Sequence, residues 1–278
     1  MSAEEASTLK SLVIDSGWGQ IIGTRKSQQD HAVIVNWPTG FALSILADGM
    51  GGHAGGAEAS HLVVDTFRQS FVDSTESNIR QRFLEGLSAA NLAVYEHAKN
   101  NPELEGMGST FLAVTFDGSA IQWISVGDSP LWLFRDGEIR QINENHSMAA
   151  VLAKQVEEGL ISKEEAASSP ERSQLLDAVL GKDIKMVDAP EEALQVQNGD
   201  IIILASDGVE TCSLEELQEL LTSETQDAAS SAKQIVAKIL TKVEEHQRKS
   251  QDNSTVNVLR ILNDQEQINT VQNKNSEA

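Results

Sequence analysis

The sequence contains few cysteines, prolines or aromatic residues. Its 278 residues include one cysteine, Cys212, and five prolines. A lone cysteine excludes an internal disulfide and therefore a disulfide-stapled secreted domain. The first residues also lack the basic and apolar segments of a secretory signal, so we expect a cytoplasmic protein. No histidine lies near Cys212 in the sequence, which favours a buried thiol over a nucleophile.

Long apolar runs are also missing. A membrane helix needs about 20 consecutive apolar residues, whereas the longest runs here are the length of a strand, such as Ile201–Ala205. The hydrophobic content of 40% is nevertheless enough for a large core. We expect one main domain, a monomer that does not bind membranes.

Basic residues are scarce relative to acidic ones. The chain has 21 Lys and Arg against 42 Asp and Glu, a formal net charge of -21. This charge opposes binding to nucleic acid or to an anionic membrane, so neither is an expected partner. Any phosphate site must therefore be local, built from a cation and an arginine.

Aspartates recur at the ends of apolar runs. Each lies beside a small residue, where a strand brings its last side chain to the rim of the core and glycine permits a sharp turn. Carboxylates gathered there would repel one another unless a cation held them. Taken singly, an Asp-Gly pair is more often a turn cap; taken together, they predict a metal site. The segments are Ser44–Gly49, Trp123–Ser129 and Ile201–Gly208, with Asp252 before the run Val256–Leu262.

The order of the predicted elements favours an α+β fold. Most strand neighbours are joined as hairpins, which indicates antiparallel sheets with segregated helices. We expect a polar N-terminal segment (1–15), a domain (16–262) with a helical flap (147–172) over the site, and a disordered tail (263–278). The predicted strands are 33–35, 41–46, a meander within 109–142, 194–196, 201–205 and 255–262, and the predicted helices are 57–74, 78–99, one after Ser213, and 228–246.

Eight short motifs occur in an order that resembles the bacterial type 2C branch of the metal-dependent protein phosphatases. Each motif alone is weak, but eight in register are specific. The resemblance extends from Ser16 to Leu262. The motifs are Gly23-Thr24-Arg25 with Asp30, Asp48-Gly49-Met50-Gly51-Gly52-His53, Met107–Thr110, Val126–Ser129, His146-Ser147, Ala178–Gly181, Ala205–Val209 and Asp252–Thr255.

The resemblance implies a serine/threonine phosphatase on a sandwich of two antiparallel β-sheets flanked by helix pairs. It also implies two firmly bound Mn²⁺ or Mg²⁺ ions and a weaker third. The roles carried over are Asp48 and Gly49 as ligands bridging the two ions, Asp207 and Asp252 as ligands of the first, Asp30 ordering metal-bound waters, Asp128 as a ligand of the third ion, and Arg25 gripping the substrate phosphate.

The residues themselves support this chemistry. Two divalent ions about 3.5–4 Å apart acidify a water between them, which then attacks phosphorus in line. Hard oxygen ligands favour Mg²⁺ or Mn²⁺ over Zn²⁺, and Arg25 offers the fork that a phosphate accepts. His53 is either a general acid for the leaving alkoxide or a residue that orients a carboxylate, with the two roles evenly balanced.

Some positions depart from the family's pattern. Gln28 and Gln29 precede Asp30 where the family usually has Asn followed by Glu or Gln, so we expect the second ion to bind more loosely. Pro130 follows Gly127-Asp128-Ser129 in place of arginine, which affects the third ion and substrate handling. None of these departures removes a core metal ligand.

The sequence therefore predicts a Mn²⁺- or Mg²⁺-dependent phosphatase of phosphoserine and phosphothreonine proteins, opposing a serine/threonine kinase. The alternative is a catalytically weak, metal-binding relative that acts as a phosphoprotein interaction module. A third reading, an acidic calcium-binding protein, needs ligands within one short loop. The aspartates here are spread along the chain, which argues against it.

Overall fold

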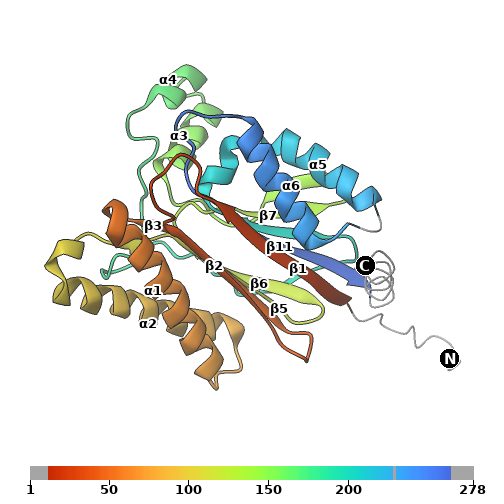
Figure 1. The fold of residues 1–278 in the computed structure, drawn as a ribbon, viewed down its shortest axis with the longest axis horizontal. Coiled ribbons are helices and arrows are strands. Elements are labelled where there is room, and N and C mark those ends of the chain that lie inside the picture. Colours follow the sequence, from red (N-terminus) through yellow and green to blue (C-terminus); the bar gives the residue numbers. More distant parts are fainter. Residues whose placement is uncertain (1–11, 228–229, 264–278) are drawn as a thin grey trace, which may run out of the picture.

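The protein folds into four layers, with two β-sheets packed face to face and a helix pair covering the outer face of each (Figure 1). This computed structural model describes residues 12–227 and 230–263, without the side chains of 52–54. The layers confirm the α+β sandwich flanked by helix pairs. The pairs are α1 (Gly52–Asp73) with α2 (Ile79–Asn100), and α5 (Leu214–Gln226) with α6 (Ala232–Glu245).

The first sheet packs against α5 and α6. All its strand pairs are antiparallel, in the order β1-β11-β10-β7-β8. Ile203 and Val258 face the helices, whereas Ile202 and Leu259 face the other sheet, the alternation expected of strands covered on both faces. The strands are β1 (Leu12–Ile21), β7 (Leu131–Arg135), β8 (Glu138–Gln141), β10 (Ile201–Ala205) and β11 (Ser254–Asn263).

The second sheet packs against α1 and α2. Its order is β2-β3-β5-β6-β9, again antiparallel throughout, and the short β4 pairs with the end of β3. Phe67, Phe71 and Phe83 of the helices fill the layer between helices and sheet. The strands are β2 (Asp30–Asn36), β3 (Ala42–Met50), β4 (Gly108–Ser109), β5 (Phe111–Phe116), β6 (Ala120–Val126) and β9 (Leu194–Gln195).

Side-chain caps set the starts of several helices. The sequence predicts a capping box from Ser213 and Glu216, which the structure confirms at the start of α5, and Ser231 forms a second one with Gln234 at the start of α6. In each box the serine hydroxyl and the longer side chain satisfy backbone N–H groups that the helix leaves unpaired. Asn78 caps α2 by accepting a hydrogen bond from a backbone N–H in its first turn.

Three sequence predictions about the strands are wrong. The sequence predicts no strand before residue 33, whereas β1 begins at Leu12, inside the predicted N-terminal segment 1–15. The predicted meander divides into two hairpins, because the chain crosses from the second sheet to the first between β6 and β7. The sequence also predicts that a turn at 198–200 links the strands 194–196 and 201–205 as neighbours, but these strands belong to different sheets and do not pair.

The predicted flap, 147–172, contains two short helices at one end of the sandwich (Figure 1). They are α3 (Met148–Glu157) and α4 (Lys163–Ser168). The predicted tail, 263–278, lies outside the described residues apart from Asn263, the last residue of β11. None of the helices in the described parts of the chain is long and apolar enough to cross a membrane.

Candidate metal centre

The five aspartates singled out in the sequence meet at one end of the sandwich, contributed by both sheets. Asp30 opens β2 and lies directly opposite Asp48 in the pairing of β2 with β3. Asp207 follows β10 and begins the 3-10 helix η2 (Asp207–Thr211), and Asp252 precedes β11. Asp128 lies in the segment where the chain crosses between the sheets. In antiparallel sheets one strand ends where its neighbour begins, so the strand termini at this end of the sandwich bring these distant residues together.

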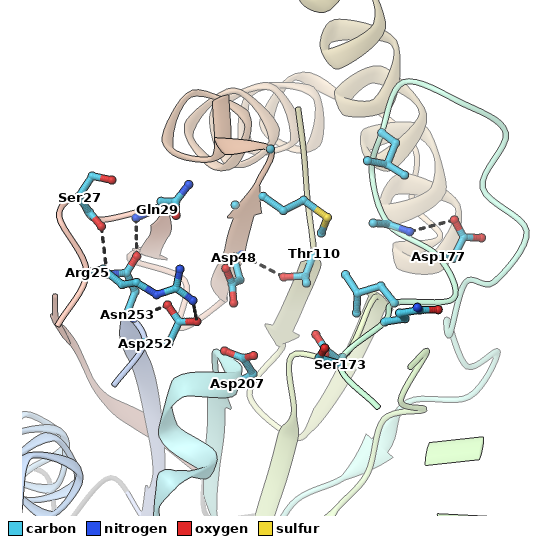
Figure 2. A pocket seen from close by; sticks show the side chains of 18 of the residues that line it. Arg25, Ser27, Gln29, Asp48, Thr110, Ser173, Asp177, Asp207, Asp252 and Asn253 are labelled. Carbon is cyan, nitrogen blue, oxygen red and sulfur yellow. Dashed lines mark hydrogen bonds and ion pairs between the residues drawn. The ribbon is translucent and has the colours of Figure 1, made fainter. Parts of the chain in front are cut away.

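A pocket of about 780 Å³ opens at this edge. Four of the aspartates line it together with Arg25, and Figure 2 shows Asp48, Asp207 and Asp252 arranged around a shared space. The segment after the flap, from Ser173 to Ala178, forms the opposite wall. The pocket is thus acidic at its centre, with a single guanidinium at its side.

The pKa of Asp48 is affected by burial and by the charges of all four other aspartates. Burial raises the pKa of Asp48 well above its ordinary value, and the charges of Asp30, Asp207, Asp128 and Asp252 raise it further. Burial also raises the pKa of Asp207, followed by the charge of Asp252, although this side chain is open to the pocket. An open concave site still replaces much of the water around a carboxylate with protein. The cluster therefore opposes its own ionisation until positive charge is supplied.

Asp128 belongs to the same electrostatic cluster. Burial raises its pKa to about 7, with further contributions from the charges of Asp207 and Glu210. Glu210 was absent from the sequence-based site. It lies in η2, and burial and then the Asp207 charge raise its pKa. Its position three residues after Asp207, one turn of a 3-10 helix further on, is the sequence signal that could have identified it.

Asp30 has one satisfied and one unsatisfied oxygen. Its Oδ2 accepts hydrogen bonds from the hydroxyls of Ser206 (2.8 Å) and Thr255 (2.7 Å). Its buried Oδ1 has no hydrogen-bond partner among the described residues, and burial is the largest cause of a pKa of about 6. A buried acceptor without a partner calls for an additional donor. A water bound to a cation is such a donor, so the site fits divalent ions held by oxygen ligands.

The backbone around Asp48 is fixed from both sides. Its N–H donates to the hydroxyl of Thr110 (2.9 Å), and its carbonyl accepts from the Ser109 hydroxyl (2.8 Å) and the Thr110 N–H (2.8 Å). At Gly49, a Cβ would lie 2.0 Å from the carbonyl oxygen of Gly56, so only glycine fits. The sequence predicts Ser109 and Thr110 to start a core strand. The structure adds their role in holding Asp48.

Arg25 lies in a loop held against the start of β11. Asn253 accepts from the N–H of Gln29 (2.8 Å) and donates to the carbonyl of Ser27 (3.2 Å). The Arg25 guanidinium lies 2.5 Å from the carboxylate of Asp252, with about half of its side chain exposed (52%). Arg25 is therefore at the pocket wall, anchored to one of the predicted metal ligands.

Three further residues discussed from the sequence have different outcomes. His53 lies in the first turn of α1, among the residues whose side chains are not described, so its role stays a prediction. His146 is buried, and its Nδ1 accepts from the N–H of Gly127 (3.3 Å), beside Asp128. Cys212 is a free, buried thiol, and burial raises its pKa to about 11. The sequence predicts a packed or turn-satisfying His146 and a buried Cys212, and both side chains are buried.

Comparison with known proteins agrees with this geometry. A family model described as protein phosphatase 2C matches residues 21–251, which is most of the chain. The chain belongs to the protein phosphatase 2C family. The match includes all the predicted site residues except Asp252, which lies one residue beyond it.

Bacterial members of the protein phosphatase 2C family are similar to this chain. The serine/threonine protein phosphatase PstP of Mycobacterium tuberculosis is 36% identical over 170 residues, which is 61% of this chain and 32% of PstP. The chain thus matches about a third of that protein's length. A putative 2C-type phosphatase of Streptococcus pyogenes is 33% identical over 191 residues, covering 66% of this chain and 74% of that protein.

The fold is also that of the protein phosphatase 2C family. A solved structure of the PstP catalytic domain in complex with two manganese ions superposes with a TM-score of 0.74. The superposition covers 91% of this chain and all of that domain, with 27% sequence identity. The layered arrangement in Figure 1 is therefore the one that holds two manganese ions in this relative.

Proposed function

We propose that this chain removes phosphate from phosphoserine and phosphothreonine residues of proteins, with Mn²⁺ or Mg²⁺ as its cofactor. The observation that carries the proposal is the convergence of five aspartates from two sheets beside one arginine. The raised pKa values of Asp30, Asp48 and Asp128 and the partnerless Oδ1 of Asp30 support a site built for cations. Bound ions would supply an activated water and offset charge on the phosphoryl oxygens.

The aspartates take graded roles in this proposal. Asp48 and the carbonyl of Gly49 would hold two firmly bound ions, and Asp207 and Asp252 would help to hold the first. The firm clamp on the Asp48 backbone supports its central position. Asp30 is buried and would not contact an ion directly. Its partnerless Oδ1 would instead accept a hydrogen bond from a metal-bound water and so orient that water. Asp128 would hold a weaker third ion.

Arg25 binds the substrate phosphate in this proposal. A guanidinium carries five N–H donors, so it can keep its contact with Asp252 and still offer a fork to a phosphate. Asp252 then places Arg25 beside the first ion, where the phosphate has to lie. His53 remains proposed either as the acid that protonates the leaving oxygen or as a residue that orients a carboxylate.

The proposal is tested by hydrolysis of an aryl phosphate and of matched phosphoserine, phosphothreonine and phosphotyrosine peptides. We expect Mn²⁺-dependent turnover that a chelator abolishes, with a preference for the first two peptides. In Asp207→Asn we expect a fall of about 100-fold or more, because even residues that only support a metal ligand contribute about 10–100-fold. Manganese binding by calorimetry provides the parallel readout.

Asp136→Asn is the matched control. Asp136 is exposed in the turn between β7 and β8, with φ of 53°, a conformation that asparagine tolerates as well as aspartate. This variant should keep the parental activity. No turnover with any divalent ion, combined with retained binding of phosphopeptides, would instead favour the interaction module. Equal loss in both variants would contradict the metal-ligand role of Asp207.

The named relatives and the lone thiol support a proposal for the biological setting. Phosphorylated proteins and the pathway of an opposing serine/threonine kinase are the proposed partners, because the named relatives are serine/threonine phosphatases. We propose a monomer that works in the cytoplasm, where an unpaired thiol such as Cys212 stays reduced. A phosphoproteome comparison in a deletion strain would identify the substrates.

A further inference from the structure

Three of the chain's six histidines lie close together on the surface around α1, outside the aspartate pocket. His31 is the second residue of β2, His61 lies on α1, and His97 lies on α2. The imidazole rings of His31 and His61 stack, with centroids 3.7 Å apart and planes 26° from parallel. Helix α1 packs across β2 (Figure 1), so this stack connects a helix to an edge strand.

A carboxylate completes the cluster. Asp65 follows His61 by four residues on α1, so both side chains project from the same face of the helix. A ring nitrogen of each histidine and a carboxylate oxygen of Asp65 all lie within 4.8 Å of one another. Arg68 donates to one oxygen of Asp65 (3.2 Å), which leaves the second oxygen to serve as a ligand.

We propose that His31, His61 and Asp65 form a second metal site, which takes a divalent transition ion such as Zn²⁺, Ni²⁺ or Co²⁺. Two imidazole nitrogens and one carboxylate suit these ions, whereas the all-oxygen aspartate centre suits Mg²⁺ and Mn²⁺. Donors on one tetrahedral ion lie about 3.3–3.6 Å apart, from bond lengths of about 2.0–2.2 Å. His61 and Asp65 are exposed, so small side-chain rotations can close the remaining gap.

The other cluster of possible ligands is less suited to an ion. Cys212, Glu216 and His246 also have ligand atoms within 4.8 Å of one another. However, Glu216 already accepts from the N–H of Ser213 at the start of α5 and pairs with His246 (3.1 Å). A metal there would disrupt a helix cap. At the His31 cluster it would displace only a ring stacking contact.

An ion at the His31 site would join two segments that lead into the aspartate pocket. His31 directly follows Asp30, and α1 follows the turn after Asp48 and Gly49. An ion that binds the folded state and not the unfolded chain stabilises the fold by mass action. We therefore expect transition ions to raise the melting temperature even when the aspartate centre is saturated with Mg²⁺.

Co²⁺ is the probe, because its visible absorption reports nitrogen ligands. The full chain is titrated with Co²⁺ in excess Mg²⁺, with absorption and melting temperature as readouts that are independent of phosphatase activity. We expect a nitrogen-ligated spectrum in the parent and an affinity about 10-fold or more lower in His61→Ala and Asp65→Asn. Because His61 and Asp65 are exposed, both variants should have the melting temperature of the parent when no transition ion is present.

Two histidine variants serve as controls. His97→Ala removes a half-buried histidine of the same surface that pairs with Glu58 (2.8 Å) and offers no ligand to the cluster. His246→Ala removes a ligand of the alternative cluster. Both should bind Co²⁺ as the parent does. Unchanged binding in His61→Ala, loss of the signal in either control, or a parental spectrum without nitrogen ligands would overturn the proposal.

Discussion

The guanidinium of Arg25 lies 2.5 Å from the carboxylate of Asp252. The sequence assigns one residue to the substrate phosphate and the other to a metal ion, and the structure joins them directly. The contact offsets part of the charge of the acidic pocket while keeping Arg25 at its wall. With the roles proposed for Arg25 and Asp252, substrate binding and metal binding would be coupled through this ion pair.

Removal of Arg25 tests this coupling. We expect Arg25→Ala to raise the KM for a phosphopeptide by about 10-fold while kcat changes much less, because phosphate binding is lost without loss of the metal ligands. Mn²⁺ affinity should change modestly, since Asp252 loses a competing partner. Arg140→Ala, at an exposed position of β8, is the control. A large fall in kcat at unchanged KM would argue against the phosphate role.

The hydroxyls that hold Asp30 provide a second test. In Thr255→Val, Oδ2 of Asp30 keeps only its bond from Ser206. We expect Mn²⁺ affinity to fall by about 10–100-fold, with activity recovered at high Mn²⁺. Thr115→Val is the matched control, because Thr115 is also buried but bonds to the carbonyl of Gln122 in the neighbouring strand. Calorimetric titration with Mn²⁺ compares the two variants. An equal loss of Mn²⁺ affinity in Thr255→Val and Thr115→Val would show a general packing effect.

The raised pKa values predict how pH affects the metal-free protein. The pKa is about 6 for Asp30 and about 7 for Asp128, against an ordinary 3.8. The folded state thus binds these protons more tightly than the unfolded chain. Their stabilising effect is complete below about pH 4 and is lost as the pH rises to about 7.

Melting temperatures between pH 4 and 8 measure this effect. With chelator present, Asp128→Asn should lose less stability across the window than the parent, and Asp136→Asn should match the parent. Mn²⁺ binds the ionised carboxylates, so its stabilising effect should grow with pH over the same range. A parent and Asp128→Asn with the same pH dependence would contradict the raised pKa of Asp128.

The flap should select among peptides without affecting the chemistry. Residues 147–172 form α3 and α4, whereas the pocket wall nearest the aspartates comes from 173–178. Exchange of 147–172 for the segment of a relative should change peptide preference and leave hydrolysis of an aryl phosphate within about twofold. Exchange of the α1–α2 connection, 74–78, is the control. Unchanged preference among a panel of phosphopeptides would exclude a selecting role.

Local patterns predict much of this fold. The capping box at Ser213, the helical spacing of Phe67 and Phe71, and the apolar run Val256–Leu262 identify their elements because the signal lies within a few residues. The strand β1 escapes prediction because Gly17 and Gly19 interrupt its pattern. These glycines lie beneath α6, where a Cβ would come within 2.8 Å of Lys233 and Val236, a reason that only the packed structure reveals.

The candidate site was predicted as a set of residues but not as a geometry. Asp30, Asp48, Asp128, Asp207 and Asp252 could be named because each stands beside a recognisable turn or strand end. Glu210 was missed, although it lies three residues after Asp207, because its importance depends on its proximity to Asp207 and Asp128 in the folded protein. The supports of Asp30, Ser206 and Thr255, are 176 and 225 residues away in the chain.

The sequence by itself determined the chemical inventory: hard oxygen ligands at strand ends, one arginine for phosphate, and no cysteine pair. These are properties of residue type and local spacing. Only the tertiary structure decided which sheet each strand joins, which oxygen of Asp30 lacks a partner, and that His31, His61 and Asp65 meet. Such facts depend on contacts between segments far apart in the chain, which the packing of two sheets and four helices brings together.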